Sequence, residues 1–321
     1  MKSVLSLLVI VTSLSVWAQS SDKNETSAKS TDVVPAGAAK TNDIDAEITN
    51  AKLRASSVGS KNALSLKLDL NLNGGNLVVP FGEVRPNYAG IAGQDSSTSL
   101  SGTIAGAYRL NDRSSLRAGT GVSISTPFQA NSGDLGNSNG KRTTSVSNPY
   151  LDFSYAARLG NAQNIFDTSY TQYTQPVYTD KYKMVGSYDV NHTIAWEFSS
   201  TKWSPGINID ANYTFFSDST KLSDTMSNPE DGRSDWTIAV FPYAEYAFND
   251  KYSFRTVFRF LTFDHYRADN SSQVYRELYT QSLGLGIAVT RDIYLYPNLQ
   301  FAPEYMSMER TNIGLSTSIN L

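Results

Sequence analysis

Hydrophobic and polar side chains alternate along most of the chain. The clearest run is residues 63–73 (ALSLKLDLNLN), in which leucines take every second position and Ser65, Lys67, Asp69 and Asn71 lie between them. A period of two is that of a β-strand, whose successive side chains point to opposite faces of a sheet. The run therefore predicts a strand with one apolar and one polar face.

The same alternation recurs as far as the C-terminus. The segments that show it are residues 63–73, 98–110, 114–127, 148–159, 164–175, 186–198, 206–216, 234–248, 251–264, 274–289, 292–303 and 311–321. Each is long enough to cross a bilayer as a β-strand, which takes about 9–11 residues. Short turns, such as Asn111-Asp112 and Asn249-Asp250, alternate with longer loops rich in Gly, Asn and Ser.

This pattern predicts an all-β fold, a transmembrane antiparallel up-and-down β-barrel. We expect about twelve strands, with ten or fourteen as the alternatives, and short turns on the periplasmic side. Pro242 and Pro297 lack the N–H that a ladder position uses, so we expect bulges or local breaks in pairing beside them. The segments around 164–175 and 274–281 alternate poorly.

Aromatic residues gather where the predicted strands meet turns and loops. Trp196, Phe198 and Trp203 lie near one predicted rim, and Tyr173 and Tyr178 lie near the other. Such girdles are typical of membrane interfaces. With this pattern, residues 62–321 resemble the bacterial outer-membrane porins and related small barrels. The resemblance implies an outer-membrane location, contact with membrane lipid, and insertion by the outer-membrane assembly machinery. The final strand, residues 311–321, ends on an apolar residue as the family's assembly signal does, although that residue is Leu instead of Phe.

The N-terminal part of the sequence differs from the rest. Residues 1–18 have one Lys, an apolar run and small residues at the end, as a secretory signal peptide does. Residues 19–61 predict a short periplasmic extension without aromatic anchors. Within it, residues 43–55 place Ile44, Ile48 and Ala51 on one helical stripe. This segment is either a transient helix in a linker or a short periplasmic helix that packs on the barrel base or on a neighbouring subunit.

Composition narrows the possible chemistry. The chain has no Cys, so disulfides, thiolate metal sites and a lipid anchor on cysteine do not arise. Its 27 basic and 30 acidic residues give a net charge of −3, which does not favour nucleic-acid binding. We find no spacing typical of a metal or cofactor site.

The alternation also assigns charged side chains to the lumen in two groups. The acidic group lies on the fourth to eighth predicted strands, and the basic group on the ninth to twelfth and the first three; Asp69 and Arg158 are exceptions. The predicted pore-lining residues are Asp152, Asp167, Asp189, Glu197, Asp210 and Glu245 in the acidic group, and Lys67, Arg109, Arg117, Arg255, Arg259 and Arg276 in the basic group. Opposed walls would set a transverse field across a pore that favours polar solutes. The alternative is a narrow lumen in which opposite charges pair and block the passage.

The first long loop, residues 74–97, is unusually apolar for an external loop. It could fold into the lumen as a constriction, pack against a neighbouring protomer, or lie over its own rim. Together with the segment 43–55 it suggests a homo-oligomer. The expected contacts are Ile44 and Ile48 against an adjacent base, and Gly102, Gly106 and Ala211 on the lipid-facing wall.

Catalysis is not expected. The sequence has two histidines. His192 shares the lipid-facing parity of Val190 and Ile194, and His265 follows Asp264 directly, so the two side chains point to opposite faces. The sequence therefore predicts a porin-like channel for passive diffusion of small polar solutes; the alternative is a structural or adhesive barrel that does not conduct.

Overall fold

The structure is a computed structural model that describes residues 43–91, 93–129, 142–217, 234–266 and 274–321. The predicted signal peptide, residues 1–18, and residues 19–42 lie outside the described residues.

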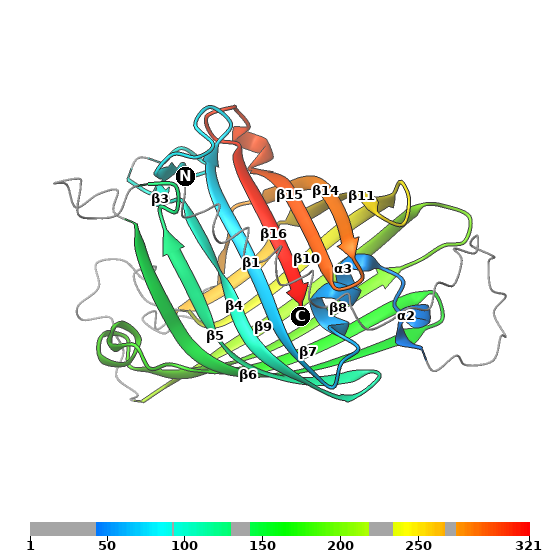
Figure 1. The fold of residues 1–321 in the computed structure, drawn as a ribbon. Helices are drawn as coiled ribbons and strands as arrows, with labels where there is room; N and C mark the ends of the chain where they lie inside the picture. The colour runs from blue at the N-terminus through cyan, green and yellow to red at the C-terminus, as the bar shows by residue number, and fades with distance from the viewer. Residues whose placement is uncertain (1–42, 92, 130–141, 218–233, 267–273) are drawn as a thin grey trace.

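Antiparallel strands form a closed barrel (Figure 1), which confirms the predicted fold. The wall has 12 strands, because β11 and β12 are two halves of one strand, and the short β13, which pairs with β12, continues into β14, which pairs with β11. Neighbours in sequence pair around the ring, and β1 closes it against β16 with Lys67 opposite Asn320. The wall strands are β1 (Leu64–Asn76), β4 (Ser99–Asn111), β5 (Ser114–Ser125), β6 (Thr143–Leu159), β7 (Ala162–Gln172), β8 (Met184–Trp196), β9 (Trp203–Phe216), β10 (Ser234–Ala247), β11 (Tyr252–Arg259), β12 (Leu261–Tyr266), β13 (Tyr275–Arg276), β14 (Thr280–Thr290), β15 (Ile293–Phe301) and β16 (Asn312–Asn320).

Strand pairing is interrupted beside both prolines. β10 pairs with β12 up to Val240 and with β11 from Tyr243 onward, so the change of partner falls at Pro242. Between β14 and β15 the paired residues stop on either side of Pro297. A residue without an N–H cannot complete the ladder at these places.

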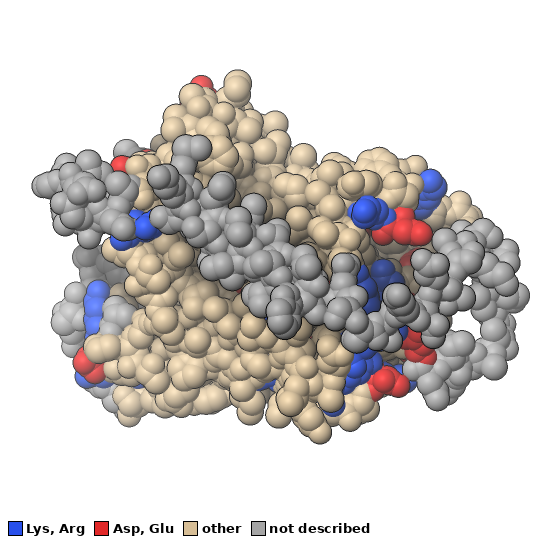
Figure 2. Space-filling view, in the orientation of Figure 1, with Lys and Arg blue, Asp and Glu red and all other residues tan. Residues whose placement is uncertain are grey.

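The outer face of the barrel is apolar. The leucines of β1 point outward, with Leu64 72% exposed, and Tyr213 on β9 is 52% exposed. In the face drawn in Figure 2, most of the visible charged side chains lie toward the two ends of the barrel, and the visible surface between them is mostly uncharged. This distribution is that of a wall whose middle band faces lipid.

The first long loop turns back onto the lumen side of the wall. It contains the two-stranded pairing of β2 (Val84–Arg85) with β3 (Ser96–Ser97). Arg85 donates hydrogen bonds to the Gly74 carbonyl (2.8 Å) and to Gln300 Oε1 (2.7 Å), and Asn312 Nδ2 donates to the Pro86 carbonyl (2.9 Å). Gln300 and Asn312 are paired residues on the lumen face of β15 and β16. Of the three arrangements expected for this loop, its central part fits folding into the lumen.

Helical elements are few and short. They are α2 (Ile44–Glu47), α3 (Ala51–Leu53), the π-helices η1 (Arg54–Val58) and η2 (Val177–Lys181), and the 3-10 helix η5 (Pro303–Tyr305). In the described part of the chain, no helix combines the length and apolar character needed to cross a membrane. Figure 1 shows α2 and α3 at the end of the barrel where the short turns lie.

The assignment of faces makes a prediction about stability. Ile209 points outward in the middle of β9, whereas Ser169 points into the lumen beside Asp189. Ile209→Lys should lower the free energy of unfolding by about 2–4 kcal/mol, because an ammonium group would enter the hydrocarbon layer. Ser169→Lys should change it by less than about 0.5 kcal/mol. Urea unfolding of protein refolded into lipid vesicles measures both, and equal losses would contradict the assignment.

Candidate functional site

Residues 43–60, called the plug below, occupy the lumen at the end of the barrel with short turns. Ile44 is 2% exposed and Ile48 is fully buried. Both belong to an apolar cluster that the plug forms with side chains on the inner wall; its members are Ile44, Ile48, Leu53 and Val58 of the plug and Ala156, Ile165, Ala195 and Tyr243 of the wall. On the other side, Ala55 packs against Tyr294 and Tyr296 of β15. The expected arrangements are a transient helix in a linker and a short helix packed on the barrel base or on a neighbouring subunit; the structure places the segment inside the lumen at that end of its own barrel.

Polar side chains of the plug fix its fold and its position together. Asn50 caps α3, because its Oδ1 accepts a hydrogen bond from the Leu53 N–H (3.1 Å). The same side chain donates through Nδ2 to Glu245 Oε2 (3.0 Å), while the Asn50 backbone N–H donates to Gln163 Oε1 (3.0 Å). Thr49 Oγ1 donates to Glu197. One short segment is thereby tied to two strands, β7 and β10, and to the turn after β8.

The C-terminal half of the plug is held through its backbone carbonyls. A helix end leaves carbonyl oxygens without intrahelical partners, and cations are favourable there. Lys67 Nζ and Arg117 (3.4 Å) donate to the Ser56 carbonyl, and Asn320 Nδ2 donates to the Ala55 carbonyl (2.7 Å). Arg109 donates to the Ser60 carbonyl (3.0 Å) and Arg291 to the Gly59 carbonyl (2.7 Å). Predicted pore-lining cations therefore act as donors to the plug.

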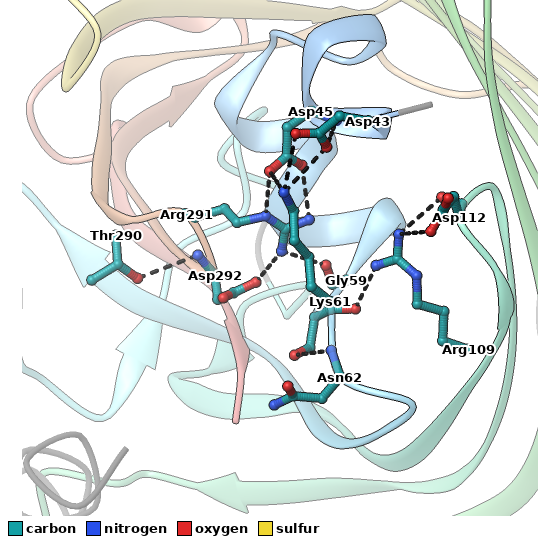
Figure 3. Close-up of polar contacts among 11 residues, drawn as sticks. Asp43, Asp45, Gly59, Lys61, Asn62, Arg109, Asp112, Thr290, Arg291 and Asp292 are labelled. Carbon is teal, nitrogen blue, oxygen red and sulfur yellow. Dashed lines mark hydrogen bonds and ion pairs between the residues drawn. The ribbon is translucent and has the colours of Figure 1, made fainter. Parts of the chain in front are cut away.

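Ion pairs fasten the start of the plug to the rim (Figure 3). Asp45 accepts two hydrogen bonds from Arg291, at Nε and NH2, both 2.8 Å long. Lys61 Nζ lies 2.9 Å from Asp45 Oδ2 and 3.1 Å from Asp43 Oδ1. We call Asp45, Lys61 and Arg291 the latch. Burial alone would raise the pKa of Asp45, but the hydrogen bonds from Arg291 and Lys61 outweigh it and lower the pKa to about 2.

The lumen charges in the half occupied by the plug pair with opposite charges on nearby strands and turns. Arg117 lies 2.5 Å from Asp152 and 2.7 Å from Asp167. Arg255 pairs with Glu245 (3.0 Å), and Glu197 pairs with Arg158 (2.8 Å). Arg117, Glu245 and Arg255 are all less than a tenth exposed. Buried charges need such partners, so here the arrangement is that of paired charges and not of two opposed walls.

Three predicted pore-lining residues keep their charges unpaired within the described residues. Asp189 and Asp210 lie on the lumen faces of β8 and β9, and Asp210 accepts a hydrogen bond from Asn191 Nδ2 (3.1 Å). Arg259 is exposed on β11, and its guanidinium lies 5.3 Å from the centre of the Phe241 ring. An acidic and a basic surface thus remain beyond the plug.

Arg276 is placed differently from the prediction. It pairs with Phe263, which in turn pairs with the outward-facing Ile238, so Arg276 is on the outer face of the sheet. Its Nε donates to the Phe260 carbonyl (3.0 Å). The alternation fails because pairing is interrupted at Phe260 and again between β13 and β14, which shifts the faces that sequence parity would assign.

The residues predicted to form oligomer contacts also have other neighbours. Ile44 and Ile48 are buried inside their own barrel, so they present no apolar surface to a second subunit. A Cβ on Gly102 would lie 1.9 Å from the Asp69 carbonyl oxygen, so this glycine permits close approach of β4 to β1. Gly106 has open space around it, and Ala211 lies on the outer parity of β9.

Neither histidine is part of a catalytic arrangement in the described residues. His192 lies 3.2 Å from Asn164 Oδ1, and its ring contacts Phe166 on the outer face. His265 Nδ1 lies 2.6 Å from Asp235 Oδ1, and its ring stacks on Trp236 with centroids 5.5 Å apart. Within the ranges described, no three His, Asp or Glu side chains are grouped as metal ligands.

Sequence reasoning missed most of the residues that dock the plug, which are Asn50 within the plug and Gln163, Arg113, Arg291 and Asn320 on the wall and its turns. Arg113 lies in a turn, yet it pairs with Glu47 of the plug at 2.5 Å. A signal was nevertheless present, because lumen-facing positions of three strands are apolar where polar residues are expected; these are Ala156, Ile165 and Ala195. An apolar patch in a polar lumen requires an apolar partner.

No protein-family model and no curated protein sequence matches the chain. Among solved structures, it is similar to an outer membrane channel from Pseudomonas putida F1, with a TM-score of 0.48 and 14% identity over 82% of this chain and 98% of that chain. It is also similar to the NanC porin, with a TM-score of 0.41 and 12% identity over 79% and 97%. OmpF of Salmonella typhi, in complex with daunomycin, gives a TM-score of 0.37 and 7% identity over 82% and 98%.

Weakening the latch should let the plug open locally from the wall. Asp45→Asn removes a partly buried charge from Arg291 and Lys61, and hydrogen bonds to charged groups contribute about 1.5–3 kcal/mol. Amide hydrogens of residues 44–58 should therefore exchange at least about tenfold faster, as hydrogen-exchange mass spectrometry can show. Asp43→Asn is the matched control, because the Asp43 side chain is 54% exposed and its pair with Lys61 should contribute little. Identical exchange in the wild type and Asp45→Asn would refute the latch.

The pKa of Asp45 sets the pH range of this contact. The value is about 2 in the folded protein and 3.8 for an unperturbed group, so the pair stabilises the docked plug above about pH 4 and is lost as pH falls toward 2. Exchange of residues 44–58, corrected for the intrinsic rate, should hold steady from pH 7 to 5 and rise below pH 4. Asp45→Asn should lack this acid step. Loosening of the wild-type plug between pH 7 and 5 would contradict the assignment.

Proposed function

We propose that the chain is an outer-membrane channel that lets small polar solutes diffuse passively, with the plug narrowing the lumen at its periplasmic end. The observation that carries the proposal is a closed 12-stranded barrel whose outer face is apolar and whose lumen is lined by polar and charged groups. Barrels of this strand number lie between eight-stranded ones, which side chains fill, and sixteen-stranded ones, which leave an aqueous channel.

The lumen beyond the plug supports the polar nature of the solute. Asp189 and Asp210 on one part of the wall, and Arg259 on β11, supply opposite charges that are not consumed by ion pairs among the described residues. Asn191, Asn208 and Thr193 add a connected row of amide and hydroxyl groups, with Asn208 Nδ2 donating to Thr193 Oγ1 at 2.7 Å. An apolar solute would have to displace water from all of these groups, which is costly.

The plug itself favours a second candidate, a structural or adhesive barrel that does not conduct. Its apolar side chains fill part of the lumen, and its carbonyls accept hydrogen bonds from several wall cations, among them Arg117 and Arg291. A plug that never leaves would block the periplasmic end, whereas a plug that leaves room beside it, or that moves, would allow conduction. The two candidates differ in whether current flows.

The remaining features of the proposal concern the cell. We propose cleavage of residues 1–18 on export, insertion into the outer membrane by its assembly machinery, and no enzymatic activity. A homo-oligomer is proposed on the outer face at Gly106 and Ala211, without a contribution from Ile44 or Ile48.

Planar-bilayer recordings can decide between the two candidates. The chain has no cysteine, so Thr49→Cys with Gln163→Cys introduces a single pair of thiols at a plug–wall contact where Gln163 Nε2 lies 3.1 Å from Thr49 Oγ1. We expect ohmic steps from the wild type. Tethering the pair with a short bifunctional thiol reagent should hold the plug in place and lower the conductance relative to the untreated variant. The same reagent on the Gln163→Cys single variant is the control.

Absence of ohmic steps in the wild type and in a variant lacking residues 43–58 would establish the blocked barrel and overturn the channel. If steps appear but tethering changes nothing, the channel stands and conducts past a fixed plug.

A further inference from the structure

Cations gather where the plug meets β11, and the nearby carboxylates do not fully balance them. Lys52 on α3 is partly exposed within the lumen and has no hydrogen bond or ion pair to the described residues. The charges that act on it are those of Arg255, Glu245, Arg259 and Asp69. The nearby Arg255 cation, followed by burial, lowers the pKa of Lys52 to about 7. Unpaired positive charge in a confined space is unfavourable unless an anion accompanies it.

The two arginines of this cluster also have donor capacity to spare. Arg255 is 3% exposed; NH1 pairs with Glu245 and the guanidinium stacks on Tyr243 at 4.0 Å, but its buried Nε has no hydrogen-bond partner. Arg259, four residues further along the same face of β11, is exposed; its guanidinium lies over the Phe241 ring, and it interacts with the Glu277 carboxylate electrostatically without forming an ion pair among the described residues. Lys52, Arg255 and Arg259 therefore outnumber the two carboxylates that act on them, Glu245 and Glu277, since Asp69 pairs with Lys67 at 3.2 Å.

We propose that this cluster is an anion-binding site in the lumen, in which Lys52 of the plug and Arg259 of the wall hold the carboxylate or phosphate group of a small polar solute. This inference rests on the proposed function and adds to it the class of solute, namely small anions. Arg255, which is buried next to the site, adds positive electrostatic potential, and its ion pair with Glu245 holds its side chain in place. Ammonium and guanidinium groups are the usual partners of such anions, and their charge-assisted hydrogen bonds are the stronger ones in proteins.

The location of the site has a consequence for the plug. Lys52 belongs to the plug and Arg259 to the wall, so an anion held between them connects the two. A ligand that binds the docked plug and not the released one stabilises docking by mass action. Bound anion should therefore slow hydrogen exchange in residues 44–58.

The test uses the full mature chain in detergent with citrate and inorganic phosphate as probes. Isothermal titration calorimetry at low ionic strength should show binding that weakens at least about tenfold in Lys52→Gln and in Arg259→Gln. The matched control is Lys202→Gln, which removes an exposed lysine of a short turn at the same end of the barrel; it should bind as the wild type does. Circular dichroism checks that each variant keeps its barrel.

A second test of the site measures hydrogen exchange of residues 44–58 with and without citrate. Citrate should slow exchange in the wild type and in Lys202→Gln, and should not do so in Lys52→Gln. No binding at millimolar citrate, or equal affinity in the wild type, Lys52→Gln and Arg259→Gln, would overturn the site. Because calorimetry needs no current, a barrel that binds anions without conducting would refute the proposed function alone, and a conducting barrel without anion binding would refute this inference alone.

Discussion

The structure depends on the closed ring of backbone hydrogen bonds, in which every strand pairs on both sides and β1 meets β16. In a lipid environment an unpaired N–H or C=O group costs several kcal/mol, so a sheet that crosses a bilayer cannot have an edge. Closure also determines the direction of the side chains, because successive residues must point alternately to lipid and to the lumen. The apolar outer band and the polar lumen are therefore two consequences of one constraint. Where the ladder is interrupted, at Pro242 and Pro297, the outward side chain is a proline, which has no N–H left unpaired.

A polar lumen in a barrel of this size brings its own requirement, because charged groups that are close together and shielded from water need partners. The half of the lumen nearest the short turns meets this requirement in two ways. Arg117 pairs with carboxylates on β6 and β7, and Arg255 pairs with one on the adjacent β10. Several cations and amides of the wall donate to plug carbonyls. The apolar side chains at Ala156, Ile165 and Ala195 are matched by those of the plug. The wall and residues 43–60 thus form one packed interior, and the other half keeps its unpaired charges Asp189, Asp210 and Arg259.

How far the sequence predicts this structure depends on how local each signal is. The strands follow from alternation within about a dozen residues, and the predicted segments overlap the observed strands throughout. The lumen parity of Lys67, Arg117 and Glu245 follows from the same signal. Arg276 was assigned to the wrong face because the interruption at Phe260 depends on pairing with β10, which no local pattern reveals. The position of Ile44 and Ile48 was also beyond local reasoning: a short amphipathic stripe shows that an apolar partner exists, and not whether the partner lies inside the barrel or beside it.

The composition of the plug explains why wall cations can hold its backbone. Residues 55–60 read ASSVGS, and apart from Val58 these side chains are small. Small side chains leave the carbonyls of Ala55, Ser56 and Gly59 open to long Lys, Arg and Asn side chains that reach inward from the wall. Gly59 has a φ of 73°, a conformation that other residues rarely adopt; it ends η1, and its N–H donates to the Arg54 carbonyl (2.9 Å). The chain then turns toward β1, so the last turn of the plug both directs its carbonyls to the cations and starts the barrel. Since these contacts use backbone oxygens of the plug, the size of its small residues matters more than their identity. The wall cations that donate to these oxygens cannot be replaced by apolar residues, because buried carbonyls would then be left unpaired.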